Sequence, residues 1–200
     1  MDTGLQTHLG IQILAGTGLA AAAGLRAFLP PLLLGVLARL DLLELRPSLE
    51  WLASTPALVI LATAVTVEIL ADKIPLLDHG LDLLQSFMKP VAGCLVLAGS
   101  LHDLAPLPAA VIALLLGGGV SGSVHLAKSG LRLASTGTTS GIGNPFLSLG
   151  EDILSLGGSL LAVFAPLLLL ALLLLVLLLL RRIVGWMRSR AQTHPQAFFP

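Results

Sequence analysis

The stretch Gly157–Leu180, GGSLLAVFAPLLLLALLLLVLLLL, decides the class of this protein. It contains no charged residue and is longer than the roughly 20 apolar residues that a helix needs to cross a bilayer. Pro166 predicts a kink within it, because proline cannot donate a backbone hydrogen bond. The stretch therefore predicts a membrane-spanning helix.

The residues on either side of this stretch predict where the helix starts and how it is oriented. Asn144-Pro145 suits a helix start, and Ser148 with Glu151 matches the S-x-x-E capping box. No lysine or arginine lies between residues 133 and 180, whereas four arginines follow: Arg181, Arg182, Arg188 and Arg190. Because positive residues stay on the cytoplasmic side, we predict a cytoplasmic C-terminus.

The whole chain has the composition of a membrane protein. Its 200 residues are 56% hydrophobic and only 11% charged, against about 25% charged residues in a typical soluble domain. We predict an all-α, polytopic transmembrane bundle in a single domain over residues 1–190, with a flexible tail at 191–200. The net charge of zero argues against a nucleic-acid partner. An internal disulfide is not expected, because Cys94 is the lone cysteine, and no metal site is expected, because no Cys/His spacing suggests a zinc site.

Three other segments are long enough to cross: Ile11–Leu40, Pro56–Ala71 and Ala109–Leu133. Arg26 and Pro30-Pro31 interrupt the first of them. The segment from Pro90 to Pro108 has too few apolar residues for a straight crossing and predicts a re-entrant or broken helix. Before it, residues 76–90 form an amphipathic pattern that suits the interface or the bundle. We expect four full spans plus the short element, and counts of five or six stay open.

A stripe of bases follows the third of these segments. In VHLAKSGLRLAS (Val124–Ser135), His125, Lys128 and Arg132 lie on one helical face. With a cytoplasmic C-terminus and a single last span, STGTTSGIGNP is an external loop, and the bases lie near the outer end of their helix. Orientation rules do not account for bases there. Two explanations stay open: binding of an anion, helped by backbone N–H groups of the loop, or pairing with Glu151-Asp152.

The tripeptide Gly-Leu-Arg occurs twice, each time after small residues, in GTGLAAAAGLR and GGGVSGSVHLAKSGLR. The two copies end at Arg26 and Arg132. They suggest an internal duplication with halves at about 11–90 and 105–180, as in many transporters, although coincidence stays open. Arg26 lies at bilayer depth, where we expect it to face a cavity or a partner rather than the lipid headgroups.

Two acids lie one helical turn apart at Glu68 and Asp72, in VEILADKIPLLDHG. If both are buried, either a base neutralises them or one carries a proton. Lys73, Arg26 and Arg132 are the candidate partners. The acids then form either a proton- or cation-coupling site or a structural network of ion pairs.

Four segments of the chain resemble the domain of unknown function 4126 family of bacterial membrane proteins. They are AGLRAFLPPLLLGVLA, EILADKIPLLDHGLD, KPVAGCLV and NPFLSLGEDIL. The resemblance implies a small polytopic membrane protein, here in the inner membrane of a bacterium, and brings no activity with it. The residues that match its polar landmarks are Arg26, Glu68, Asp72, Lys73, Asp78 and Glu151.

The function predicted from these observations is a small transporter or lipid-headgroup translocator for an anionic or zwitterionic substrate. The candidate substrate ligands are Arg26, His125, Lys128 and Arg132. The candidate proton- or ion-coupling residues are Glu68, Asp72, Lys73, Asp78, Glu151 and Asp152. The alternative is a non-catalytic membrane scaffold whose buried charges fix helix packing. An enzyme is not expected. Membrane lipids and a small anionic or lipid-phosphate ligand are the expected partners, and a homo-oligomer stays open.

Overall fold

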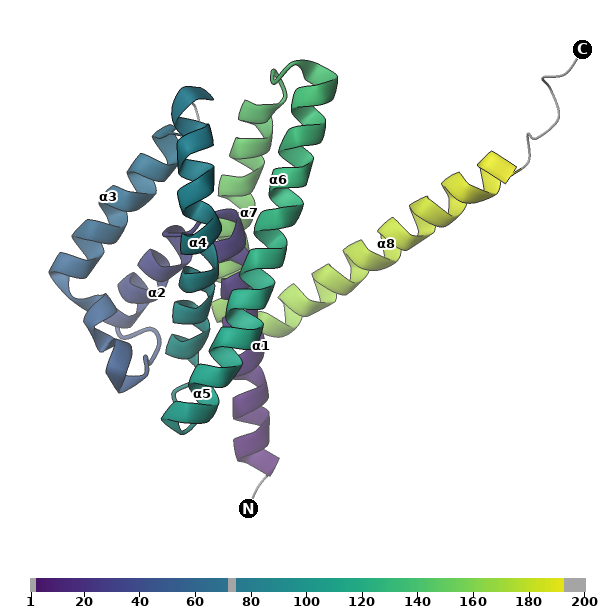
Figure 1. The fold of residues 1–200 in the computed structure, drawn as a ribbon. Coiled ribbons are helices and arrows are strands. Elements are labelled where there is room, and N and C mark those ends of the chain that lie inside the picture. Colours follow the sequence, from purple (N-terminus) through teal and green to yellow (C-terminus); the bar gives the residue numbers. More distant parts are fainter. Residues whose placement is uncertain (1–2, 72–74, 193–200) are drawn as a thin grey trace, which may run out of the picture.

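The computed structural model describes the backbone of residues 3–71 and 75–192, and the side chains of residues 8–71 and 84–184. Every regular element in this part is helical, which confirms the predicted class (Figure 1). η1 is a 3-10 helix and η2 is a π-helical segment. In chain order the elements are α1 (Thr3–Leu25), α2 (Leu29–Arg39), η1 (Pro47–Ala53), α3 (Thr55–Ala71), α4 (Pro75–Ser100), α5 (Pro106–Ile112), η2 (Ala113–Gly118), α6 (Gly119–Thr139), α7 (Asn144–Phe164) and α8 (Pro166–Gln192).

Within the described residues, four helical segments are long and apolar enough to cross a bilayer. They are His8–Leu25, Pro106–Thr139, Asn144–Phe164 and Pro166–Val184. The second of them is one continuous helix made of α5, η2 and α6. The pair η1 and α3, bent by 65°, adds a fifth crossing if it counts as one span. The number of candidate spans agrees with the sequence, but the spans are not the same ones. The predicted span Pro56–Ala71 counts only as part of the bent pair, and two other predicted segments are divided differently.

The apolar stretch Ile11–Leu40 forms two helices with a break between them. α1 ends at Leu25 and α2 begins at Leu29, so Arg26 lies in the break. Two prolines occupy the start of α2, where a missing backbone N–H leaves no helical hydrogen bond unmade. The sequence thus located the interruption correctly.

The predicted single span Gly157–Leu180 is wrong. Ala165 has φ −146° and ψ 60°, which ends α7, and Pro166 then begins α8. Proline is favoured at the first position of a helix and clashes inside one, so the chain starts a new helix there instead of kinking an old one. Two spans, α7 and α8, therefore replace the predicted one.

The predicted capping box at Ser148 and Glu151 is also wrong. α7 begins at Asn144, as predicted, so Ser148 and Glu151 lie inside the helix instead of at its start. Both side chains are buried, with 3% and 7% of their surface exposed. The S-x-x-E pattern therefore marks an inward-facing polar stripe and not a helix cap.

The predicted re-entrant element between Pro90 and Pro108 is also wrong. Residues up to Ser100 belong to α4, a 26-residue helix with Pro90 inside it. Close packing supports the second half of this helix, because Gly93 of α4 lies directly against Gly117 of η2. A β-carbon on either glycine would collide with the backbone of the other. The amphipathic segment and the short apolar segment are therefore one helix, packed within the bundle.

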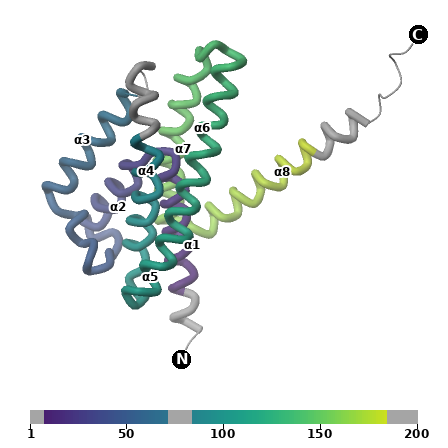
Figure 2. The backbone as a smooth tube through the Cα atoms, in the orientation of Figure 1, coloured from purple at the N-terminus to yellow at the C-terminus, as the bar shows by residue number. Residues whose placement is uncertain are grey.

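α1 lies at the centre of the bundle and packs most extensively against α4, α7 and α6 (Figure 2). Its small residues allow this, since Ala20 and Ala23 are fully buried. A β-carbon at Gly24 would lie 2.5 Å from the backbone oxygen of Ser121, so α1 and α6 approach very closely there. The centre of the fold is thus built around the first of the two Gly-Leu-Arg segments.

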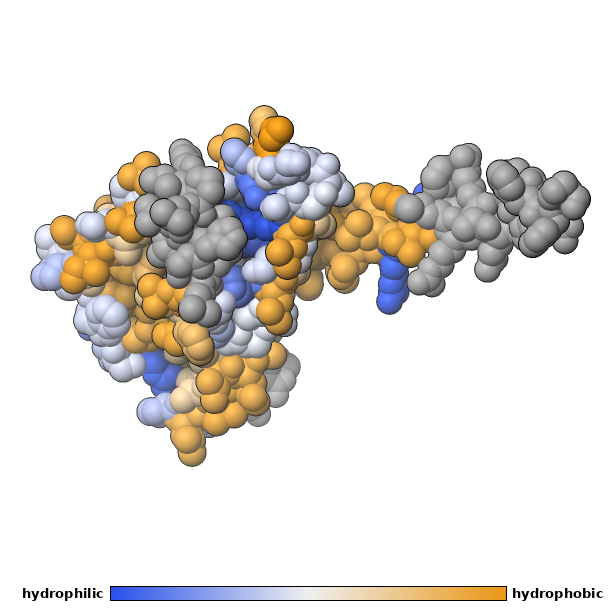
Figure 3. All heavy atoms as spheres, turned by 45° about the horizontal axis from the view of Figure 1, so that its top comes forward, coloured by the Kyte–Doolittle hydropathy of each residue, from blue (hydrophilic) through white to orange (hydrophobic). Residues whose placement is uncertain are grey.

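Much of the surface that the structure describes is apolar. None of the crossing segment of α8 is buried, and this helix extends away from the other helices (Figure 1). In the space-filling view, hydrophilic surface gathers in the middle of the visible face, whereas α8 is mostly apolar (Figure 3). Burying apolar surface in lipid and polar groups inside is the arrangement expected of an integral membrane protein.

Candidate functional site

The buried residues of α6 form one polar stripe: Ser121, His125, Lys128 and Arg132. The three bases thus share one helical face, as their spacing predicts, and that face points into the bundle. The opposite face of α6 is exposed and carries Leu126, Leu131 and Leu133. A charged side chain on that face would meet hydrocarbon, which explains why the charges turn inward.

Lys128 and Arg132 both bind Glu151 of α7. Lys128 Nζ lies 2.8 Å from Glu151 Oε2. Arg132 donates from Nη2 to the same oxygen at 3.1 Å and from Nε to Oε1 at 3.3 Å. One buried carboxylate therefore joins two cations of the stripe. This is one of the two explanations that the sequence left open for bases at this end of α6.

Arg26, which lies in the break between α1 and α2, contacts the same turn of α7. Its Nε lies 2.6 Å from Asp152 Oδ1, a close ion pair whose N–H is directed too obliquely for a regular hydrogen bond. Its Nη2 donates to Ser148 Oγ at 2.9 Å. Only 1% of Arg26 is exposed, so the predicted inward orientation is correct. We call Arg26, Lys128, Arg132, Glu151 and Asp152 the charge cluster.

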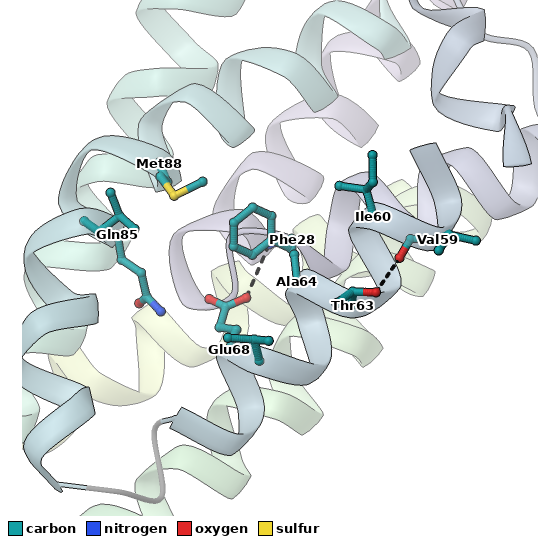
Figure 4. Close-up of a pocket in the computed structure, with 10 residues that line it drawn as sticks. Phe28, Val59, Ile60, Thr63, Ala64, Glu68, Gln85 and Met88 are labelled. Atoms are coloured by element: carbon teal, nitrogen blue, oxygen red, sulfur yellow. Dashed lines mark hydrogen bonds between the residues drawn. The ribbon is translucent and has the colours of Figure 1, made fainter. Parts of the chain in front are cut away.

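Two charged side chains, one of them Lys128 of the charge cluster, satisfy the backbone at the break between α1 and α2. Lys128 Nζ donates to the carbonyl oxygen of Leu25 at 3.3 Å, at the C-terminal end of α1. Glu68 of α3 accepts the backbone N–H of Ala27 at 2.9 Å and that of Phe28 at 3.4 Å, just before α2 (Figure 4). A cation at a helix C-terminus and an anion at an N-terminus both match the helix dipole. Glu68 thus binds the backbone of this break from α3, and only 2% of its surface is exposed.

The comparisons with known proteins give a family. The family model described as Domain of unknown function (DUF4126) matches residues 13–186. The chain belongs to this family. No curated protein and no solved structure matches the chain. The match to the DUF4126 family includes the whole charge cluster, from Arg26 to Asp152, and assigns no role to any of its residues.

Lys89 is a buried charge that the sequence reading of this DUF4126 chain missed. It is 0% exposed, and its Nζ lies 3.2 Å from His125 Nδ1. His125 Nε2 lies 3.1 Å from Ser86 Oγ on the other side of the ring. If Lys89 is protonated it can only donate, and Nδ1 of a neutral His125 is then the acceptor with the ring proton on Nε2. Lys89 stands next to Pro90, where the predicted re-entrant segment begins.

Three predicted site residues cannot be compared with this arrangement. Asp72 and Lys73 lie outside the described residues. Asp78 lies on α4, in a part of the helix where only the backbone is described. Among the side chains that the structure describes, no group of three or more His, Cys, Asp or Glu residues is arranged to hold a metal ion.

The predicted loop STGTTSGIGNP is shorter than expected. α6 extends to Thr139 and α7 begins at Asn144, so only Ser140–Gly143 connect them. Ser140 and Gly141 have φ of 52° and 86°, which makes the reversal tight. If the candidate spans α7 and α8 both cross the membrane, this turn lies on the same side as the C-terminus. Its predicted external position, which rested on a single last span, is therefore wrong if the C-terminus is cytoplasmic.

Proposed function

We propose that this protein is a transporter or lipid-headgroup translocator for an anionic or zwitterionic substrate, and that the substrate anion binds at the charge cluster. The observation that supports this most is the meeting of Arg26, Lys128 and Arg132 on two adjacent acids of α7 beside a helix break. Broken helices next to buried charges are a recurring design of substrate sites in transporters.

In this proposal the substrate anion takes the place of a carboxylate of α7 on the cations of the charge cluster. Glu151 presents two oxygens to Arg132, at 3.3 Å and 3.1 Å. A substrate carboxylate or phosphate presents the same pair of acceptors to a guanidinium fork. The substrate can therefore replace Glu151 or Asp152 on its cations, provided that the displaced acid takes up a proton or turns toward water. The acids then hold the site closed between substrates.

The energetic cost of the charge cluster favours a functional role. Burying ion pairs requires desolvation, and well-packed apolar residues in their place are often as stable or more stable. Ionisable residues inside a membrane bundle are therefore functional candidates by default. Lys128, Arg132 and Glu151 keep only 4%, 6% and 7% of their surface exposed, so the cluster is almost closed to its surroundings.

The second candidate is a membrane scaffold, and two sets of contacts favour it. Glu68 binds two backbone N–H groups at the break, which is a structural task. The pairing of Lys128 and Arg132 with Glu151 also fixes α6 against α7. In a scaffold these contacts only hold the helices together, and Glu68 does not couple protons.

Coupling by Asp72, Lys73 or Asp78 stays a proposal, as does the bacterial inner membrane as location. No catalytic step is proposed.

The variant Glu151→Gln separates the two candidates. In a transporter the acid competes with the substrate, so its neutralisation raises the affinity for inorganic phosphate or short-chain phosphatidic acid by about tenfold, equivalent to about 1.4 kcal/mol. In a scaffold it lowers stability and creates no anion binding. Calorimetric titration of the purified protein measures the affinity, and thermal unfolding measures the stability. Glu50→Gln, at an exposed position of η1, is the matched control. Unchanged or absent anion binding would exclude the proposed substrate site.

A further inference from the structure

A cleft of about 430 Å³ lies between α3 and α4 (Figure 4). Its volume falls within the range of about 300–1,000 Å³ that is typical of small-molecule sites. The walls are apolar and come from both helices: Ile60 and Val67 from α3, and Leu84 and Met88 from α4. Phe28, in the break between α1 and α2, also lines the cleft. The cleft therefore connects the outer surface of the bundle with the helix break.

The mouth of the cleft faces the surroundings of the bundle. Ile60 is 67% exposed, Val67 is 53% exposed and Leu84 is 54% exposed. α3 is also part of the bent pair that is apolar enough to cross a bilayer. In a membrane these side chains meet lipid, so a ligand with a hydrocarbon chain enters the cleft sideways without crossing water.

The floor of the cleft holds two polar groups, Glu68 and Gln85. Each is only 2% exposed, and the two side chains face each other across the cleft (Figure 4). Among the residues that the structure describes, the buried Oε1 of Gln85 has no hydrogen-bond partner. A buried acceptor without a donor is costly, and a ligand that brings a donor removes this cost.

The chemistry of this floor selects the headgroup. The Gln85 carbonyl oxygen and the Glu68 carboxylate are both acceptors, and the carboxylate also attracts positive charge. Its two oxygens already accept the backbone N–H groups of Ala27 and Phe28, which hold it in place. A primary ammonium group matches the site, because it carries three N–H donors and one positive charge. A quaternary ammonium group carries the same charge but cannot donate.

We propose that the α3–α4 cleft binds one aminolipid molecule, with its hydrocarbon chain between the two helices and its primary ammonium group at Gln85 and Glu68. The inference rests on the proposed function and names the zwitterionic member of its substrate class. In such a lipid the phosphate lies next to the ammonium group along the headgroup. Arg26 of the charge cluster and Lys89 both act electrostatically on Glu68. They favour its ionised form, and their repulsion of a further cation makes the hydrogen bonds of the ammonium group, and not its charge alone, the basis of binding.

Native mass spectrometry of the full chain tests this directly. The protein is reconstituted in nanodiscs with equal parts of phosphatidylethanolamine, phosphatidylcholine and phosphatidylglycerol that carry identical acyl chains, and the lipids retained after detergent extraction are weighed. We expect one phosphatidylethanolamine per chain, in about tenfold preference over phosphatidylcholine, as one hydrogen bond to a charged group provides. Equal retention of the three lipids would overturn the proposal.

Three variants locate the binding. Gln85→Leu removes the unpaired acceptor and is expected to abolish the preference for phosphatidylethanolamine. Val67→Trp fills the cleft from an exposed wall position and is expected to abolish retention itself. Leu131→Trp, on the exposed face of α6, is the matched control and is expected to retain the lipid. If Gln85→Leu does not fold, the two tryptophan variants decide: equal retention in both places the lipid outside the cleft.

The result is separable from that of the proposed function. If Val67→Trp retains the lipid while Glu151→Gln still raises anion affinity, the cleft is not the lipid site and the charge cluster stays a substrate site. If Val67→Trp loses the lipid and Glu151→Gln has no effect on anion binding, the cleft binds an aminolipid and the proposed function is excluded.

Discussion

Arg132 of α6 holds Glu151 of α7 with two nitrogens, Nε at 3.3 Å and Nη2 at 3.1 Å from the two carboxylate oxygens. This geometry uses the planar fork of the guanidinium group, which a lysine ammonium does not reproduce. Because Lys128 shares one of the oxygens at 2.8 Å, the carboxylate depends on both cations. The kind of base at position 132 therefore matters as much as its charge.

Arg132→Lys and Arg26→Lys are each expected to weaken phosphate binding while the protein still assembles. Losing one charge-assisted hydrogen bond costs about 1.5–3 kcal/mol, or roughly ten- to a hundredfold in affinity. Calorimetric titration with inorganic phosphate or short-chain phosphatidic acid, in detergent, measures the change.

Arg39→Lys is the control for these two variants, since Arg39 is exposed and donates to Ala53 and Thr55 away from the charge cluster. It is expected to leave the affinity unchanged. Tight binding retained in both cluster variants would contradict an anion site at the two arginines.

Glu68→Gln is expected to destabilise the break between α1 and α2. Glutamine keeps one acceptor oxygen, and its amide nitrogen would face a backbone N–H, donor against donor. The loss is about 1.5–3 kcal/mol in the free energy of unfolding, because Glu68 is almost fully buried. Denaturant titration in mixed micelles measures it, with the exposed Glu44→Gln as control. Unchanged stability together with an altered pH dependence of transport would instead assign Glu68 to proton coupling.

Gly24→Ala tests the close approach of α1 and α6. The added β-carbon would lie 2.5 Å from the Ser121 oxygen and 2.7 Å from the Val124 β-carbon, so the helices must separate. Overpacking of this kind costs about 1–3 kcal/mol. Gly130→Ala is the matched control, since nothing lies within 4 Å of its added carbon, and alanine there should gain about 0.5–1 kcal/mol. Equal stability of the two variants would contradict the close approach.

Features that depend on local periodicity could be predicted from the sequence. The helical class, the start of α7 at Asn144 and the common face of His125, Lys128 and Arg132 all follow from residue spacing within one or two turns. The repeated Gly-Leu-Arg suggests a duplication that brings Arg26 and Arg132 toward one polar cavity, and the structure places both beside neighbouring acids of α7. Whether that repeat is a true duplication stays a prediction.

Features that depend on contacts between distant segments could not be predicted. Glu68 caps a break that lies 41 residues earlier in the chain, and no local pattern marks a carboxylate for that task. Lys89 is buried because α6 brings His125 to it. Pro166 reads equally well as a kink or as the start of a helix, and the backbone turn at Ala165 settles the choice.

We predict that the C-terminus and the α6–α7 turn lie on the same, cytoplasmic side of the membrane. Positive residues favour the cytoplasmic side, and arginines at positions 181 and 182 follow the apolar part of α8. Two crossings, α7 and α8, then bring the α6–α7 turn back to that same side, at the end of α6 that carries Lys128 and Arg132.

All these bases then obey the same orientation rule, so no exception is needed for α6. A green fluorescent protein fused after Arg190, and one inserted at Gly141, should both fluoresce, whereas alkaline phosphatase at either position should be inactive. A fusion before His8 is the control, because α1 runs parallel to α6 and begins at the opposite end of the bundle (Figure 1). Opposite signals at Gly141 and Arg190 would mean that α8 does not cross the membrane, and the single-span topology would have to be restored.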